Sequence, residues 1–200
     1  MEFVLKKLFL HVPLVIAGVL FAATAASAAD TFHAVATGGL TYGGDAWQVA
    51  TSSNGKPVHI RGGGRFTAGG GAAWLSGDYP IMASLTANYH VDTRAGDNTS
   101  ATFTRVPLDA MVYYTGLKTL RFGVGLSYIV SPTVKATVDG NEQSIKFNNA
   151  FGKSFEIGYE VAPSLWANLR LSSQKFKPKT SGAARDASVS HLSVNVSYLF

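Results

Sequence analysis

Alternation of apolar and polar residues constrains this chain more than any other feature, and it is clearest over the last nine residues. Five apolar side chains occupy every second position: Leu192, Val194, Val196, Tyr198 and Phe200. Polar residues fill the positions between them, and only Leu199 departs from the pattern. Successive side chains of a β-strand point to opposite faces, so the segment predicts a strand with one apolar and one polar face.

The same period of two recurs in seven earlier segments. They cover residues 32–42, 60–74, 81–89, 106–114, 120–130, 155–161 and 165–171. Eight is the smallest usual number of strands for a closed transmembrane barrel, and no segment after residue 28 approaches the length of an apolar helical span. The sequence therefore predicts an all-β fold, an eight-stranded antiparallel up-and-down transmembrane β-barrel.

The connections between these segments alternate between short and long. Short connections fall near residues 76–78, 115–118 and 162–163, and long ones at 43–58, 91–102, 131–149 and 175–188. Transmembrane barrels carry short turns on the inner side of the membrane and long loops on the outer side. Asn54-Gly55 and Asp139-Gly140 are favoured two-residue hairpin turns, so two of the long loops are expected to rise as β-ribbons, the first re-aimed by a bulge at Gly43-Gly44.

The beginning of the chain has the composition of a targeting segment. Lys6 and Lys7 precede an almost wholly apolar run from Leu8 to Ala23, and Ala26-Ser27-Ala28 offers small residues for cleavage. Such a run suits a cleaved signal peptide better than a transmembrane anchor of roughly 20 residues. We expect a signal peptide at 1–28 and one barrel domain at 29–200. With no cysteine in the chain, a disulfide framework and a thiolate metal site are excluded.

A soluble barrel is the rival interpretation, because alternation alone does not say which face looks outward. The polar face is rich in Gly, Ser, Thr and Asn and poor in the Lys and Glu of a soluble surface. Small polar residues fit the cramped lumen of an eight-stranded barrel. Aromatic residues, Tyr113 among them, gather toward the strand ends, as the girdles of a barrel do at membrane interfaces. Both features favour a membrane barrel.

The alternating ending Leu192-x-Val194-x-Val196-x-Tyr198-x-Phe200 resembles the C-terminal signal by which the barrel assembly machinery recognises outer-membrane proteins. With the leader and the strand count, the chain resembles the eight-stranded OmpA/OmpX-type superfamily, without a motif that identifies a subfamily. The resemblance implies export to a Gram-negative outer membrane, where lipid, lipopolysaccharide and, during biogenesis, the assembly machinery are the expected partners.

Charged residues of both signs share the polar face. They are Arg61, Arg65, Asp109, Arg121, Glu156, Glu160 and Arg170. Enclosed charges are tolerated when they are paired, so these residues predict a network that plugs the barrel. The alternative is a selectivity ring in a narrow conduit. We favour the plug, because eight strands leave an interior about wide enough for side chains to fill.

Catalytic and metal sites find little support in the sequence. The histidines that follow the leader lie on different strands or strand edges without metal-ligand spacing. Ser84 with His90, and Ser190 with His191, are the pairs that a lipid A-modifying barrel enzyme would use, but proximity in sequence is not triad geometry. We expect no catalytic residues, no metal and no cofactor.

The last long loop is basic. Lys175, Lys177, Lys179 and Arg185 precede the first acid, Asp186. Lipopolysaccharide phosphates or anionic glycans are the ligands expected for such a cluster. The basic excess does not indicate nucleic-acid binding, because no nucleic-acid motif is present. The expected function is a non-enzymatic structural or surface-interaction barrel, with a narrow porin-like channel and a lipid A-modifying enzyme as alternatives.

Overall fold

The computed structural model describes residues 30–51, 55, 57–96, 98–179 and 187–200. The expected signal peptide at 1–28, and with it Asn54 and Arg185, lies outside these residues. Within the described part of the chain, no helix is long and apolar enough to cross a membrane.

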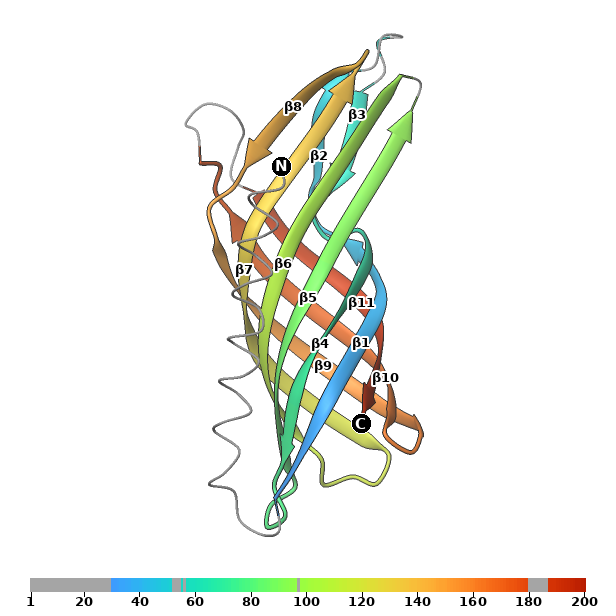
Figure 1. Ribbon diagram of the computed structural model, residues 1–200, viewed down its shortest axis with the longest axis vertical. Helices are drawn as coiled ribbons and strands as arrows, with labels where there is room; N and C mark the ends of the chain where they lie inside the picture. The colour runs from blue at the N-terminus through green and yellow to red at the C-terminus, as the bar shows by residue number, and fades with distance from the viewer. Residues whose placement is uncertain (1–29, 52–54, 56, 97, 180–186) are drawn as a thin grey trace.

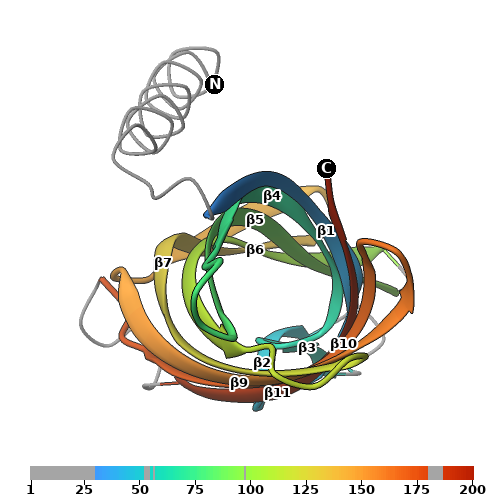
Figure 2. The same ribbon diagram turned by 90° about the horizontal axis from the view of Figure 1, so that it is seen from below.

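Eight antiparallel strands close into a barrel (Figures 1 and 2). They are β1 (Thr31–Gly43), β4 (Arg65–Leu75), β5 (Ile81–Gly96), β6 (Thr99–Tyr114), β7 (Leu120–Val138), β9 (Ala150–Ala162), β10 (Leu165–Phe176) and β11 (Ala187–Leu199). Among these eight, each strand pairs with the one that precedes it and the one that follows it along the chain. The first strand, β1, pairs with the last, β11, and closes the ring, with Leu40 opposite Val194. The predicted eight-stranded up-and-down barrel is confirmed.

The apolar face of each strand looks outward. Val124 and Leu126 on β7 are 61% and 64% exposed, whereas Ser127 between the same strand's outward positions is 5% exposed. A soluble barrel would bury these aliphatic side chains, so the exposed apolar surface is the lipid-facing belt of a membrane barrel. Tyr113 departs from the expected aromatic girdle, because it points into the lumen and is 3% exposed.

The connections at the two ends of the barrel differ in length (Figure 1). Short turns follow β4, β6 and β9 at one end, where the C-terminus also lies. At the other end β2 (Ala46–Thr51) pairs with β3 (Pro57–Arg61), and β8 (Asn141–Lys146) pairs with the extension of β7. Asp139 and Gly140 both have positive φ, 49° and 82°, as the predicted two-residue turn requires.

Two predicted boundaries are wrong. Residues 91–102 are not a long loop, because β5 and β6 continue as a paired ribbon to Gly96 and Thr99. The segment 60–74 is not one strand: Ile60 lies on β3, and the buried turn at residues 62–64 separates it from β4. Consecutive glycines at these three positions allow the chain to reverse in little space, which alternation of the flanking residues does not reveal.

Candidate functional site

An ion network fills the middle of the lumen. Arg170 on β10 donates from Nε to Glu156 Oε2 at 2.6 Å and from Nη1 to Asp109 Oδ2 at 3.0 Å. Glu156 and Asp109 are 1% and 6% exposed, so both carboxylates are withdrawn from water. Asn88 Nδ2 also donates to Asp109, at 3.0 Å, and Tyr113 Oη donates to Glu156 Oε1, at 3.0 Å. The two buried charges are thereby paired and hydrogen-bonded, the condition under which burial is tolerated.

Arg121 extends this network toward the short-turn end. Its guanidinium lies between the rings of Trp166 and Tyr113, 4.4 and 4.7 Å from their centroids. It donates to Asn168 Oδ1 and Ser197 Oγ at 2.8 and 2.9 Å, and lies 3.6 Å from Glu156. A Cβ on Gly158 would come within 2.7 Å of Arg121 Nε, so the absent side chain makes the space for the guanidinium.

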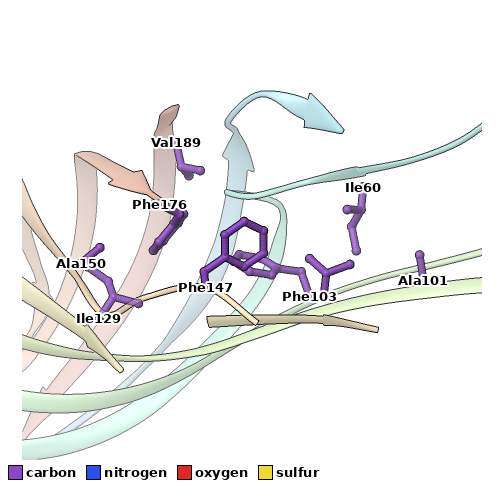
Figure 3. Close-up of a cluster of buried hydrophobic side chains, with 9 residues drawn as sticks. Ile60, Ala101, Phe103, Ile129, Phe147, Ala150, Phe176 and Val189 are labelled. Carbon is purple, nitrogen blue, oxygen red and sulfur yellow. The ribbon is translucent and has the colours of Figure 1, made fainter. Parts of the chain in front are cut away.

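Apolar clusters close the lumen on both sides of the network. Toward the hairpin end Phe103, Phe147 and Phe176 meet edge to face, with Ile60 and Val189 among the buried neighbours (Figure 3). Toward the other end Ala73, Met82, Met111, Tyr113 and Leu199 form a second cluster. Every member of both clusters is less than 9% exposed.

Small polar cavities lie between these clusters. Two polar cavities, of about 40 and 30 Å³, lie in the lumen, and both are lined by Arg170 and Asn195. A water needs roughly 10–15 Å³ of such space, so each cavity holds a few waters at most. Arg170 and Asn195 stand between the two cavities.

The structure brings together four of the seven residues expected in the lumen: Asp109, Arg121, Glu156 and Arg170. Glu160 lies near the short-turn end, where it accepts a hydrogen bond from the Ser164 backbone at 3.1 Å. The expectation that Arg61 and Arg65 join the network is wrong. The turn at 62–64 interrupts the alternation on which their placement depended, and both lie at the hairpin end, Arg65 half exposed.

Arg105 and Trp166 are lumen residues that the sequence did not single out, and Tyr113 is one that it placed in the aromatic girdle instead. Arg105, 2% exposed, donates from Nε to His90 Nδ1 at 2.7 Å and lies 5.7 and 5.8 Å from the ring centroids of Phe103 and Phe176. It occupies the same face as Asp109, four residues earlier, so extending the alternation of 106–114 by one residue finds it.

Neither serine–histidine pair has catalytic geometry. Ser190 is exposed and contacts Ser173 Oγ at 3.1 Å, whereas its neighbour His191 belongs to the opposite face of β11 and lines the lumen. His90 contacts Thr41 Oγ1 and the Gly64 carbonyl, each at 2.8 Å, in addition to Arg105. Ser84 lines the other lumen cavity. No cluster of three His, Asp or Glu suited to a metal ion occurs within the described residues.

The basic loop continues into a surface that the sequence did not predict. Lys179 N donates to the Lys146 carbonyl and Asn148 N to the Lys177 carbonyl, both at 2.9 Å, so the two segments run side by side. Phe147 is buried between them, while Lys146, Lys175, Lys177 and Lys179 are exposed. These four lysines are called the basic rim below.

The side chains of the expected assembly signal share the outer face of β11. Leu192, Val194, Val196, Tyr198 and Phe200 are between 39% and 69% exposed. The rings of Tyr198 and Phe200 meet edge to face at 4.8 Å, and Phe200 N donates to the Ala34 carbonyl at 2.9 Å. The last residue thus continues the pairing of β11 with β1.

Comparison with known proteins places the fold. The model of the outer membrane protein beta-barrel domain family matches residues 14–200. The crystal structure of Neisserial surface protein A is similar, with a TM-score of 0.56 at 12% identity over 86% of this chain and 99% of the other. Ail, the attachment invasion locus protein of Yersinia pestis, crystallised with the heparin analogue sucrose octasulfate, gives 0.54 at 8% identity over 84% and 99%. No curated protein matches the sequence.

Proposed function

Because the chain belongs to the outer membrane protein beta-barrel domain family, we propose that it is a closed, non-enzymatic barrel of the outer membrane that acts through its outer surface. Residues 1–28 direct export and are removed, and the apolar column that ends at Phe200 is read by the barrel assembly machinery. The role in the envelope is structural, with the hairpin end available for surface interactions.

The filled lumen is the observation that carries this proposal. A conduit needs a continuous hydrated path, and here a paired ion network lies between two apolar clusters, with cavities of only about 40 and 30 Å³. The four charges neutralise one another through contacts of 2.6, 3.0 and 3.6 Å. This arrangement supports a plug over the selectivity ring that was the alternative.

Conductance in planar bilayers tests the plug. Refolded protein is expected to give no discrete steps, and a porin refolded in parallel serves as the positive control. Discrete steps that disappear in Arg121→Ala or Glu156→Ala would instead identify the network as a selectivity ring and overturn the proposal.

The basic rim supplies the surface interaction. Lys146, Lys175, Lys177 and Lys179 are exposed on two paired backbone segments, and Arg185 follows them in the sequence. We propose that they bind anionic glycans, either phosphorylated lipopolysaccharide sugars or sulfated polymers. The ligand named for the Ail structure makes sucrose octasulfate a suitable probe.

Salt-dependent binding tests the rim. Lys177→Glu with Lys179→Glu is expected to weaken binding of sucrose octasulfate and heparin, most strongly at low ionic strength, because exposed charges act through a screened field. Lys118→Glu, an exposed site in a short turn at the other end, is the matched control. Equal binding by the rim variant and the control would remove the rim from the proposal.

A further inference from the structure

A second basic feature lies apart from the basic rim, at the top of the wall formed by β11, β1 and β4. Three arginines, Arg61, Arg65 and Arg94, border a hollow of about 380 Å³ whose apolar side is formed by Leu40, Leu192 and Val194. We call it the arginine-rimmed hollow. It exists because the wall steps down there: β5 continues to Gly96, whereas β4 begins at Arg65, whose neighbour Phe66 pairs with Val91.

The three arginines surround one buried carboxylate. Asp92, 1% exposed, lies 3.6 Å from Arg65 Nε and 3.8 Å from Arg94 Nε, and accepts the Arg61 backbone N–H at 3.3 Å. Both ion pairs are longer than a hydrogen bond, and Asp92 Oδ1 has no hydrogen-bond partner among the described residues. The Arg65 and Arg94 side chains remain 53% and 42% exposed. Three arginines facing one carboxylate leave a net charge of two positive units at the edge of the arginine-rimmed hollow.

The turn at 62–64 fixes the positions at which Arg61 and Arg65 leave the backbone beside Asp92. A Cβ on Gly64 would lie 2.5 Å from Asp92 Oδ2, so the turn at 62–64 packs directly on the carboxylate. Arg65 is held at φ 68°, a conformation that an L-residue adopts at a cost of roughly 1–3 kcal/mol. The Arg61 guanidinium lies over the Tyr42 ring, 5.6 Å from its centroid.

The apolar side of the hollow belongs to the lipid-facing belt. Leu40 pairs with Val194 across β1 and β11, and Tyr42 pairs with Leu192. Leu40 and Val194 are 67% and 59% exposed, so a continuous apolar surface begins directly beneath the guanidinium groups. A ligand that fits must carry an anion at one end and hydrocarbon at the other.

We propose that the arginine-rimmed hollow binds the phosphorylated glycolipid of the outer leaflet, with a lipid A phosphate held by Arg65 and Arg94 and an acyl chain lying along Leu40 and Val194. The planar guanidinium matches a phosphate bidentately, which an ammonium does not. A soluble polyanion leaves the apolar surface unused, and an uncharged lipid leaves two positive charges unpaired. This site is independent of the basic rim and of the filled lumen.

The test uses the full barrel in dodecyl maltoside micelles, which carry no charge, titrated with bisphosphorylated lipid A and followed by native mass spectrometry. The native protein is expected to bind this lipid at least tenfold more tightly than fully dephosphorylated lipid A. Arg65→Gln with Arg94→Gln is expected to abolish that preference. Lys118→Gln with Lys135→Gln removes the same charge at two exposed lysines outside both basic surfaces and is expected to keep it.

Removing both arginines leaves Asp92 buried without a cation, so folding is controlled separately. The variant that adds Asp92→Asn removes the orphaned charge, and the heat-modifiable shift of the unboiled band reports the folded barrel. Arg65→Lys with Arg94→Lys keeps the charge without the planar fork and is expected to lose several-fold in affinity.

Three outcomes would overturn the proposal: equal binding of phosphorylated and dephosphorylated lipid A, retained preference in the folded triple variant, or displacement of lipid A by equimolar sucrose octasulfate. The last outcome would mean a site for soluble polyanions. Sucrose octasulfate binding by Lys177→Glu with Lys179→Glu is measured separately, so a failure here stays distinct from a failure of the basic rim.

Discussion

Replacing Arg170 by methionine tests how much the ion network contributes to stability. The guanidinium contacts both Glu156 and Asp109, at 2.6 and 3.0 Å. Methionine fills much of the same space without charge, so the variant isolates the electrostatic loss from the packing loss. Both carboxylates would stay buried in the lumen, out of contact with bulk water.

The loss of Arg170 leaves the two carboxylates with different numbers of remaining partners. Glu156 keeps the Tyr113 hydroxyl at 3.0 Å and Arg121 at 3.6 Å, whereas Asp109 keeps the amide of Asn88 and, among the described residues, no ion pair within 4.0 Å. Removing one partner of a buried pair typically costs about 3–5 kcal/mol, so the folded-to-unfolded ratio should fall roughly 10²- to 10⁴-fold. Adding Asp109→Asn neutralises the more isolated acid and should recover about 2 kcal/mol.

Denaturant unfolding in phospholipid vesicles, followed by tryptophan fluorescence, measures these free energies. Lys153→Met on the outer side of the adjacent strand β9 is the control, because it removes an exposed cation of similar size. A loss of less than about 1 kcal/mol for Arg170→Met, equal to that of Lys153→Met, would refute the claim that buried pairing holds the plug.

Three further predictions concern the packing beside the network, the closure of the lumen and the last residue of the chain. Gly158→Ala should destabilise the barrel by about 1–3 kcal/mol in the same unfolding assay, because its Cβ would meet Asn168 Oδ1 at 2.6 Å, whereas Gly38→Ala, whose nearest neighbour is at 3.9 Å, should be nearly neutral. Arg170→Ala joins the two lumen cavities but should still give no conductance steps in planar bilayers, since the apolar clusters persist; steps would show that the network alone seals the lumen. Phe200→Ser should lower the yield of heat-modifiable barrel in outer membranes without lowering the stability of protein refolded in vitro by more than about 1 kcal/mol, and a matching loss in both would make Phe200 a purely structural residue.

Alternation predicted the barrel well because the lipid and the lumen impose opposite chemistry on successive residues. The strand 120–130 could be assigned from its sequence alone. Asp109, Arg121, Glu156 and Arg170 could be placed in the lumen from their parity, that is, from whether they occupy the apolar or the polar positions of the alternation. Parity is a property of one uninterrupted strand, however. It failed at the turn 62–64, where consecutive glycines reset the alternation and moved Arg61 and Arg65 out of the network.

Contacts between strands distant in sequence could not be read from any single segment. The arginine-rimmed hollow depends on where β5 outruns β4, and the basic rim on the pairing of Phe147 with Pro178, which adds Lys146 to the loop lysines. Strand length and register set both features, and the alternation within one segment does not say which residue of a neighbouring strand it faces or where one strand outruns the other. The same limit explains why 91–102 read as a loop: its polar residues continue a ribbon that has left the membrane.

The lumen and the outer surface of this barrel are therefore under different constraints. In the lumen the charges of the network are held by partners from several strands, Arg170 on β10 by acids on β6 and β9, so a substitution there alters the whole network. At the hairpin end Lys177, Arg65 and Arg94 remain exposed, so a substitution there is expected to act mainly on ligand binding, once the buried Asp92 is neutralised in variants that lose both Arg65 and Arg94. The proposed plug and the two proposed binding surfaces therefore make a joint prediction: binding assays on these surfaces and unfolding assays on the lumen should report separable effects.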